Sequence, residues 1–267
     1  MTMSTEFASM SAFARLSAVL GRAAAPAVLA LGLAASVTAV AGEGESFPAA
    51  GNDVRNNASL QRGARNFMNY CSGCHSAQYV RYNRVAADLH ISDDVLRSNL
   101  IFNPDTKSAD VIRSSLPTED AKRWFGNAPP DLSLIARSRG TAYISAFLKS
   151  FYVDPSRPTG VNNLVLKGTA MPHVLASLQG VQTAEFTTEK GQMGDVEKFE
   201  KFVLTTPGSM TPAQYDEFVR DTVNFLDYIG EPAQVHRQDL GVWVILFLLV
   251  FAGFAYGMKK EYWKDVT

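Results

Sequence analysis

Apolar residues form two continuous runs near the ends of this 267-residue chain, with helically spaced stripes between them. One run extends from about Ala25 to Val40, and the other extends from Leu240 to Met258. Between the runs, residues 60–70 and 215–229 place apolar side chains on one face at helical intervals. The pattern predicts a mainly α-helical domain of roughly 200 residues, which is long enough for one substantial core.

Residues 1–41 have the three parts of a secretory signal. Arg15 and Arg22 come before the Ala-rich run, and an Ala-Val-Ala sequence at 39–41 closes it. A basic start, a short apolar centre and an Ala-x-Ala end are typical of a cleaved signal peptide. We expect residues 1–41 to be removed during export, and an uncleaved N-terminal membrane anchor is the alternative.

Residues 240–258 predict a transmembrane helix. The run has no charged side chain. At 1.5 Å per residue it reaches roughly 28 Å, about the thickness of the hydrocarbon core of a bilayer. Trp243 and Tyr256 lie near its two edges, where interfacial aromatic residues gather. A buried core helix is the alternative, but the run is apolar on every face.

Basic residues after this run set its orientation. Lys259, Lys260 and Lys264 follow it directly. The positive-inside rule then places residues 259–267 in the cytoplasm. It places residues 42–239 on the periplasmic side of a bacterial cytoplasmic membrane, in agreement with the signal peptide. The formal net charge of −1 gives no indication of nucleic-acid binding.

The only two cysteines of the chain lie in the sequence Cys71-Ser72-Gly73-Cys74-His75. Cys-x-x-Cys-His is the attachment motif of c-type haem, in which both thiols bond to the porphyrin and the imidazole ligates the iron. A zinc site would need four ligands, and the chain has no second cysteine pair. A thioredoxin-like dithiol would follow a strand in a βαβ unit, and no such pattern surrounds the motif. We therefore predict one covalent haem c.

Two predicted helices enclose the domain. Ser59 can cap a helix from Leu60 to Tyr70 that ends at the cysteine motif. A capping box and a terminating glycine define the last helix: Thr211, Pro212, Gln214 and Gly230. In class I cytochromes c the first and last helices cross at a small residue, and Gly63 is the candidate for that contact.

The sequence between these helices contains many breaks. Asn127–Asp131 carries two prolines and precedes a helical stretch from Leu132 to Arg137. Asp154–Gly160 opens a long loop. Residues 180–210 mix Gly, Thr, Glu and Lys, and we interpret them as loops or a short hairpin.

A haem iron bound by His75 needs a sixth ligand on its other face. A methionine thioether there raises the reduction potential, which suits an electron acceptor of a respiratory chain. Met171 is the preferred candidate because it lies in a long loop and Pro172 restricts the backbone after it. His173 and His90 are the competing ligands.

Two arginines that follow the Pro-Pro-Asp-Leu-Ser stretch at 129–133 are candidates for binding the haem propionates. An arginine beside a buried cofactor needs a counter-charge, which a propionate supplies. We favour Arg137 for this role and leave Arg139 open. A solvated pair on a helix surface is the alternative.

Together these segments resemble the cytochrome c1 family, the haem subunit of the respiratory ubiquinol–cytochrome c reductase (the bc1 complex). The resemblance spans roughly residues 52–264. It is carried by the haem-attachment segment, the Pro-Pro-Asp-Leu-Ser segment, the axial-methionine segment and the closing helix: residues 69–84, 128–139, 170–172 and 215–232.

The resemblance implies a class I cytochrome c-like haem domain with loop insertions, plus one C-terminal transmembrane helix. It implies that His75 and Met171 are the axial ligands and that Arg137 and Tyr143 lie near the haem. It implies transfer of one electron from the Rieske iron–sulfur protein to cytochrome c, within a dimeric complex that contains cytochrome b. No substrate bond is made or broken on such a chain.

Two other functions stay open at this point. A free-standing, membrane-tethered cytochrome c would shuttle electrons alone, and a haem enzyme or sensor would keep an open coordination site. A shuttle normally has a long tether, whereas Glu231–Asp239 leaves about nine residues before the membrane. Acidic residues within 185–200 are candidates for steering a basic cytochrome c, although lysines are interleaved with them.

Overall fold

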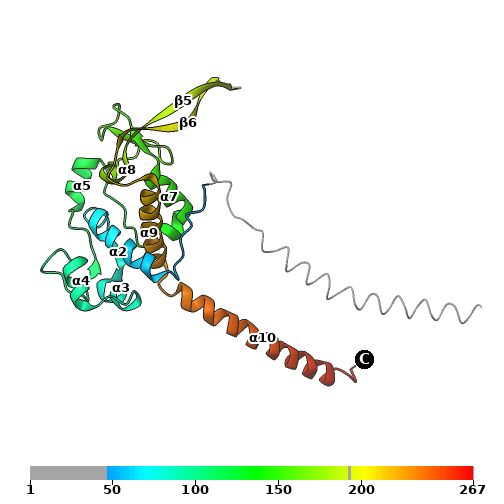
Figure 1. Cartoon of the computed structure of the whole chain (residues 1–267). Coiled ribbons are helices and arrows are strands. Elements are labelled where there is room, and N and C mark those ends of the chain that lie inside the picture. The colour runs from blue at the N-terminus through cyan, green and yellow to red at the C-terminus, as the bar shows by residue number, and fades with distance from the viewer. Residues whose placement is uncertain (1–46, 192–193, 267) are drawn as a thin grey trace, which may run out of the picture. The chain divides into compact units, whose positions relative to one another are not determined.

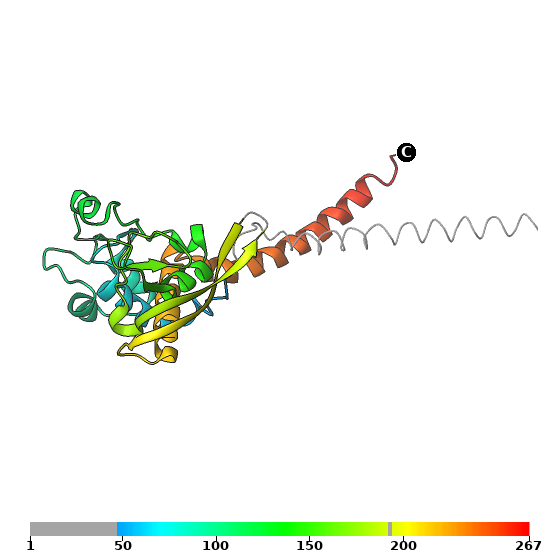
Figure 2. The same ribbon diagram turned by 90° about the horizontal axis from the view of Figure 1, so that it is seen from above.

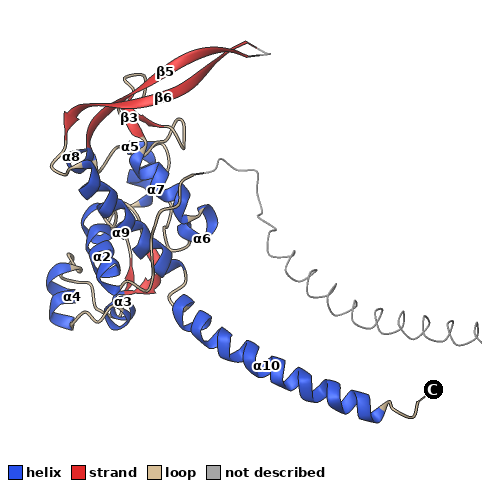
Figure 3. Cartoon of the chain, turned by 45° about the vertical axis from the view of Figure 1, so that its right-hand side comes forward, coloured by secondary structure: helices blue, strands red, loops and turns tan. Residues whose placement is uncertain are grey.

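The computed structural model describes residues 47–191 and 194–266. The predicted signal peptide, residues 1–41, lies outside the described residues and stays a prediction. The described chain is mainly α-helical, with three small antiparallel sheets of two strands each (Figures 1 and 3).

Helices α2 (Asn57–Tyr70) and α9 (Pro212–Gly230) form the centre of the domain and pack against each other (Figure 1). They meet at Gly63. A Cβ atom there would overlap the backbone oxygen of Asp221 and lie 2.8 Å from the Cβ of Phe225. The prediction of Gly63 as the small contact residue between the first and last helices is confirmed.

The two helix starts differ in how well the sequence defines them. At the last helix the Thr211–Gln214 capping box is present, and α9 ends at Gly230 as predicted. The first helix begins earlier than predicted because Asn56, not Ser59, is its cap. The Asn56 side chain accepts a hydrogen bond from the Ser59 backbone N–H. The Ser59 hydroxyl is buried and donates instead to the Asp221 carboxylate at 2.6 Å.

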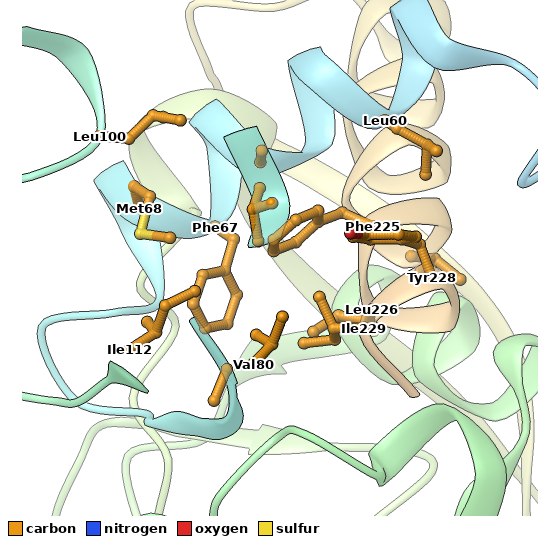
Figure 4. Packing of buried hydrophobic residues seen from close by; sticks show 14 of the residues in the cluster. Leu60, Phe67, Met68, Val80, Leu100, Ile112, Phe225, Leu226, Tyr228 and Ile229 are labelled. Carbon is orange, nitrogen blue, oxygen red and sulfur yellow. The ribbon is translucent and has the colours of Figure 1, made fainter. Parts of the chain in front are cut away.

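A hydrophobic core lies where α2 and α9 meet strand β1 (Figure 4). The rings of Phe67 and Phe225 are 5.6 Å apart, and both side chains are fully buried. Val80 and Ile112 come from the paired strands β1 (Ala77–Arg81) and β2 (Val111–Ile112) and close the core below them. The segment that follows the cysteine motif is thus fixed against both central helices.

Short elements surround this centre. Two of them, α6 and α7, pack on α9. The remaining helices and the second sheet are α3 (Tyr82–Asp88), α4 (Asp93–Asn99), α5 (Thr118–Phe125), α6 (Ile135–Arg139), α7 (Thr141–Lys149), α8 (Ala176–Gln179), β3 (Phe151–Val153) and β4 (Val161–Asn163).

Residues 180–210 contain a long hairpin, where the sequence suggested loops or a short one. Strand β5 (Gly180–Gly191) pairs with β6 (Gly194–Pro207), and the ribbon extends past the helices (Figures 2 and 3). The ring of Phe186 contacts Tyr152 of β3 at 5.9 Å and attaches the hairpin to the domain. Two register shifts between β5 and β6 interrupt the alternation of inward-facing and outward-facing residues that a regular hairpin shows in its sequence.

A single long helix, α10 (Gln234–Tyr262), follows α9 after three residues. It contains the predicted span, has a mean hydropathy of 2.3 over its most apolar window, and buries none of its side chains. A long apolar helix with no protein around it fits a lipid environment. At its start, Asp239 forms an ion pair of 2.8 Å with Arg55, just before α2.

Candidate haem-attachment site

The cysteine motif occupies the turn that ends α2. The backbone N–H of Cys71 still bonds to Phe67 O. The N–H groups of Cys74 and His75 then turn back to Cys71 O, at 3.1 and 2.8 Å. The two sulfurs form no disulfide with each other, and Cys71 is half-buried while Cys74 is exposed. The helix end therefore presents two unpaired thiols one turn apart, followed by an imidazole, which is the donor set that covalent haem attachment requires.

The surroundings of Cys71 favour a neutral sulfur. Burial raises the pKa of its thiol to about 12, so a thiolate is disfavoured there. Zinc ligands and redox-active dithiols work as thiolates, whereas a thioether carries no proton. Among residues 47–191 and 194–266, no three His, Cys, Asp or Glu side chains are grouped to hold a metal ion.

His75 is oriented by a backbone carbonyl. Its Nδ1 lies 2.8 Å from Pro130 O, and a carbonyl oxygen only accepts hydrogen bonds. Nδ1 therefore carries the proton, and Nε2 keeps a free lone pair. Burial also lowers the pKa of His75 and favours the neutral ring. A neutral imidazole with a fixed tautomer and a free Nε2 fits an iron ligand.

The segment that supplies this carbonyl is held close to the motif. Leu132 N–H donates to Ser76 O at 2.8 Å, and the Asp131 carboxylate accepts from Gln78 N–H at 3.0 Å. The same carboxylate accepts from Ser133 N–H. Sequence reasoning treated the two prolines mainly as a break, and it missed Pro130 as the partner of His75. The distance of 55 residues between them left no local signal.

The Met171 loop is ordered by buried amides. Asn163 is fully buried, and its side-chain oxygen accepts from Val165 N–H and Leu166 N–H, at 2.9 and 3.1 Å. Met171 is half-buried, and its backbone N–H donates to the Thr169 hydroxyl at 3.3 Å. The loop thus has a defined path, and the assignment of Met171 as a ligand stays a proposal.

The two competing histidines lie in different surroundings. His90 is exposed, with a left-handed backbone at φ 55°. The His173 ring stacks on Phe151 at 4.9 Å, and burial lowers its pKa to about 4. Its Nε2 is buried with no hydrogen-bond partner among the described residues.

A row of aromatic rings leads from helix α7 to the Met171 loop. Tyr143 stacks near Phe147, Phe147 contacts Phe151, and Phe151 stacks on His173, with centroid distances of 6.3, 5.1 and 4.9 Å. The guanidinium of Arg139 lies 5.5 Å from the Tyr143 ring centre. The row brings Tyr143 into continuity with the loop that carries Met171.

Arg137 has a protein counter-charge. Its guanidinium donates to the Glu231 carboxylate at 2.7 Å, at the end of α9. Arg237 of α10 donates to the same carboxylate at 2.6 Å. Two guanidiniums share this one carboxylate, so the protein supplies Arg137 with a partial counter-charge, and its assignment as a propionate partner stays a prediction.

The helix crossing, the thiol pair at the end of α2 and the oriented imidazole define a c-type cytochrome of the class I arrangement, here joined to a membrane helix. The chain matches the Cytochrome C1 family over residues 52–266 and belongs to it.

Curated relatives cover nearly the whole chain. It is 47% identical to cytochrome c1 of Allochromatium vinosum over 88% of this chain and 95% of the relative. It is 41% identical to a Nitrosomonas europaea protein named ammonia monooxygenase gamma subunit, over 90% of this chain and 97% of that protein. It is 28% identical to cytochrome c1 of Rhodospirillum rubrum over 78% of this chain and 81% of the relative.

Proposed function

We propose that this chain is the haem subunit of a ubiquinol–cytochrome c reductase, carrying one electron at a time from the Rieske protein to cytochrome c. The observation that carries the proposal is the His75–Pro130 hydrogen bond beside the thiol pair, because it leaves Nε2 free for iron. Cytochrome c1 relatives over most of the chain support the same conclusion. The bound haem supplies a one-electron iron couple, and no substrate bond is made or broken.

Within this proposal, the protein holds one covalent haem c. Cys71 and Cys74 form thioethers, and His75 and Met171 are the axial ligands. The half-buried Met171 sulfur favours the reduced iron and so raises the potential. The aromatic row from Tyr143 to His173 excludes water on the side of the Met171 loop.

We place Tyr143 near the haem and propose Arg139 rather than Arg137 for the propionates. Arg139 makes no ion pair among the described residues and lies against Tyr143. Arg137 shares the Glu231 carboxylate with Arg237, so the protein balances part of its charge. Arg139→Gln should change the reduction potential, while Arg137→Gln should leave it near the wild-type value, as measured by redox titration of purified protein.

Membership of the family supports a proposal for the partners and the location. We propose cytochrome b and the Rieske protein as neighbours in a dimeric complex in the bacterial cytoplasmic membrane. Residues 1–41 are a cleaved signal, residues 42–239 lie in the periplasm, and residues 259–267 lie in the cytoplasm. Mass spectrometry of the purified chain tests the cleavage, and a mature N-terminus at residue 1 would contradict it.

Covalent attachment is tested on denatured protein. The wild-type chain should keep its haem colour on a denaturing gel after free haem is extracted. The Cys71→Ala/Cys74→Ala double variant should lose it, and Ser72→Ala, which changes neither thiol, should retain it. A colourless wild-type band would overturn the proposal.

Met171→Leu tests the sixth ligand. The variant should lose the low-spin six-coordinate spectrum and show a lower potential, because the thioether is gone. Met210→Leu is the matched control, since Met210 packs against the hydrophobic core. A wild-type spectrum in Met171→Leu would assign the ligand elsewhere, with His173 the next residue to replace.

A free-standing shuttle is the alternative, and purification in mild detergent separates the two. Co-isolation of cytochrome b and a Rieske protein supports the complex. The three residues between α9 and α10 favour it too, since a shuttle needs a longer tether.

A further inference from the structure

Met171 is carried by a loop that has no secondary structure of its own. Residues 164–175, all of which the structure describes, lie between β4 and α8 and form neither helix nor strand. The only two cysteines of the chain belong to the haem-attachment motif, so no disulfide can brace this loop. A metal ligand needs neighbouring groups that fix its position. The position of Met171 therefore depends on the side chains that bind its loop.

Two side chains hold Gly168, three residues before Met171. The Asn162 side-chain oxygen accepts from Gly168 N–H at 2.8 Å, and the Arg157 guanidinium donates to Gly168 O at 2.7 Å. Both backbone polar groups of Gly168 are thus bound by side chains. A Cβ atom built on this glycine would lie 3.6–3.8 Å from three atoms of the guanidinium, which therefore covers the residue. Gly168 has a left-handed backbone at φ 77°, where the loop turns.

The two side chains that hold Gly168 are joined to each other through Asp154. Its carboxylate accepts from the Asn162 amide at 2.9 Å. The Arg157 backbone N–H donates to Asp154 O at 3.1 Å, which closes the turn that carries the guanidinium. Hydrogen bonds from the Ser156 hydroxyl and the Asn162 amide hold the pKa of the Asp154 carboxyl below its usual range, so this group stays charged at neutral pH. The contact with Gly168 is therefore made from a fixed frame.

The Arg157 side chain keeps its position over the loop at a cost. Its Nε is buried and has no hydrogen-bond partner in the parts of the chain that the structure describes. A buried N–H group without an acceptor lowers stability, and local conflicts of this kind are typical of functional sites. After Gly168, the buried Thr169 hydroxyl accepts from Met171 N–H at 3.3 Å. A shift of Gly168 is therefore passed to Met171 over a short distance.

We propose that Arg157 is the positioning residue for the sixth iron ligand, and that its hydrogen bond to Gly168 O keeps the Met171 sulfur at the iron. This inference rests on the proposed function, because it takes Met171 as an axial ligand. Arg157 acts through the loop and not by direct contact with the iron. Without its hydrogen bond the loop can move away, and the sixth position opens to small ligands.

Carbon monoxide binding measures how firmly Met171 holds the iron, because the gas and the thioether compete for one position on the reduced haem. The reduced wild-type chain in detergent should bind carbon monoxide weakly. Arg157→Gln should bind it about tenfold more tightly or better, the range found when a group that supports a metal ligand is removed. Arg157→Lys keeps the charge and one donor, so its affinity should lie between the two. Wild-type affinity in both variants would overturn the proposal.

Lys167→Gln is the matched control. It removes a positive charge from the residue next to Gly168 and leaves both hydrogen bonds of Gly168 in place. Its carbon monoxide affinity and reduction potential should match those of the wild type. Arg157→Gln should have a lower potential, because a weaker thioether bond favours the reduced iron less. Equal changes in the two variants would assign the effect to charge and overturn the positioning role.

Hydrogen exchange separates positioning from general destabilisation. In Arg157→Gln the amides of residues 164–171 should exchange faster, whereas those of α2 and α9 should keep their wild-type rates. Faster exchange in both helices as well would show that the variant loosens the whole domain, and this result would overturn the proposal.

The two proposals fail in different ways. If the wild-type chain holds no covalent haem, or if Met171→Leu keeps the wild-type spectrum, the proposed function fails. If Met171→Leu loses its sixth ligand while Arg157→Gln binds carbon monoxide like the wild type, only the role of Arg157 fails.

Discussion

The α2–α9 crossing joins segments that are distant in sequence, whereas the β5–β6 hairpin joins two consecutive strands, and we expect the two regions to tolerate substitution very differently. At the crossing, the backbone of α9 lies against Gly63, and buried Asn224 donates to the Ser59 hydroxyl, which in turn donates to the Asp221 carboxylate. In the hairpin, most side chains on β6 from Lys198 to Leu204 are exposed. The difference shows that this domain concentrates its close packing and buried hydrogen bonds at the helix crossing and not on the hairpin.

The largest effect should come from Gly63→Ala. The new Cβ would overlap Asp221 O, so the helices must separate, and we expect a loss of about 3 kcal/mol or more in unfolding free energy. Denaturation of the full chain in detergent, followed by far-ultraviolet circular dichroism, measures it. Gly253→Ala in α10 meets nothing within 4 Å and serves as the control. Wild-type stability in Gly63→Ala would contradict the close crossing.

Asp221→Ala should come next. It leaves Ser59 Oγ without its acceptor at 2.6 Å, and it leaves Arg62 with Glu217 at 3.4 Å in place of the Asp221 carboxylate at 2.5 Å. Since Arg62 is partly exposed, water can hydrogen-bond to its guanidinium in the variant. We therefore expect a loss of about 2–3 kcal/mol in unfolding free energy. Asp216→Ala, which removes an exposed carboxylate of the same helix and its surface ion pair with Lys149, is the matched control. Equal stability of the two variants would show that the buried carboxylate is dispensable.

Tyr215→Phe should have a smaller effect. The hydroxyl donates to Leu148 O at 2.8 Å in a buried setting, which raises the pKa of the phenol and leaves it neutral. Its loss leaves that carbonyl unpaired and should cost about 1–2 kcal/mol, measured in the same denaturation experiment. No change would mean that water replaces the hydroxyl.

Glu185→Gln in the hairpin should have the smallest effect. Its ion pair with Lys201 is exposed, and such pairs contribute under about 1 kcal/mol. We expect a change below about 0.5 kcal/mol that disappears at high salt. A loss comparable to that of Asp221→Ala would remove the contrast between the two regions.

The sequence predicted the parts of this molecule that depend on local chemistry. The Thr211–Gln214 capping box and the uniformly apolar stretch within α10 have short-range signatures, and both are confirmed. Gly63 at the crossing was inferred from the helix arrangement of class I cytochromes c, and it is confirmed too. The hairpin length was wrong because two register shifts and interleaved charges hide the alternation of its strands.

Long-range partners were harder to predict. The pairing of Arg137 with Glu231 joins residues 94 positions apart, and neither carries a local sign of the other. The Pro130 carbonyl that orients His75 is a backbone atom, so no residue type indicates it. The haem-attachment motif itself was recognisable because its function requires fixed residue types at fixed spacing.

The three residues between α9 and α10 can span no more than about 10 Å, and the Arg55–Asp239 ion pair holds the domain to the start of the anchor. A domain joined to its anchor by so short a connection has little freedom to move away from it. The proteins that donate electrons to this domain and accept electrons from it must therefore move to reach it, while this subunit stays in place as a relay.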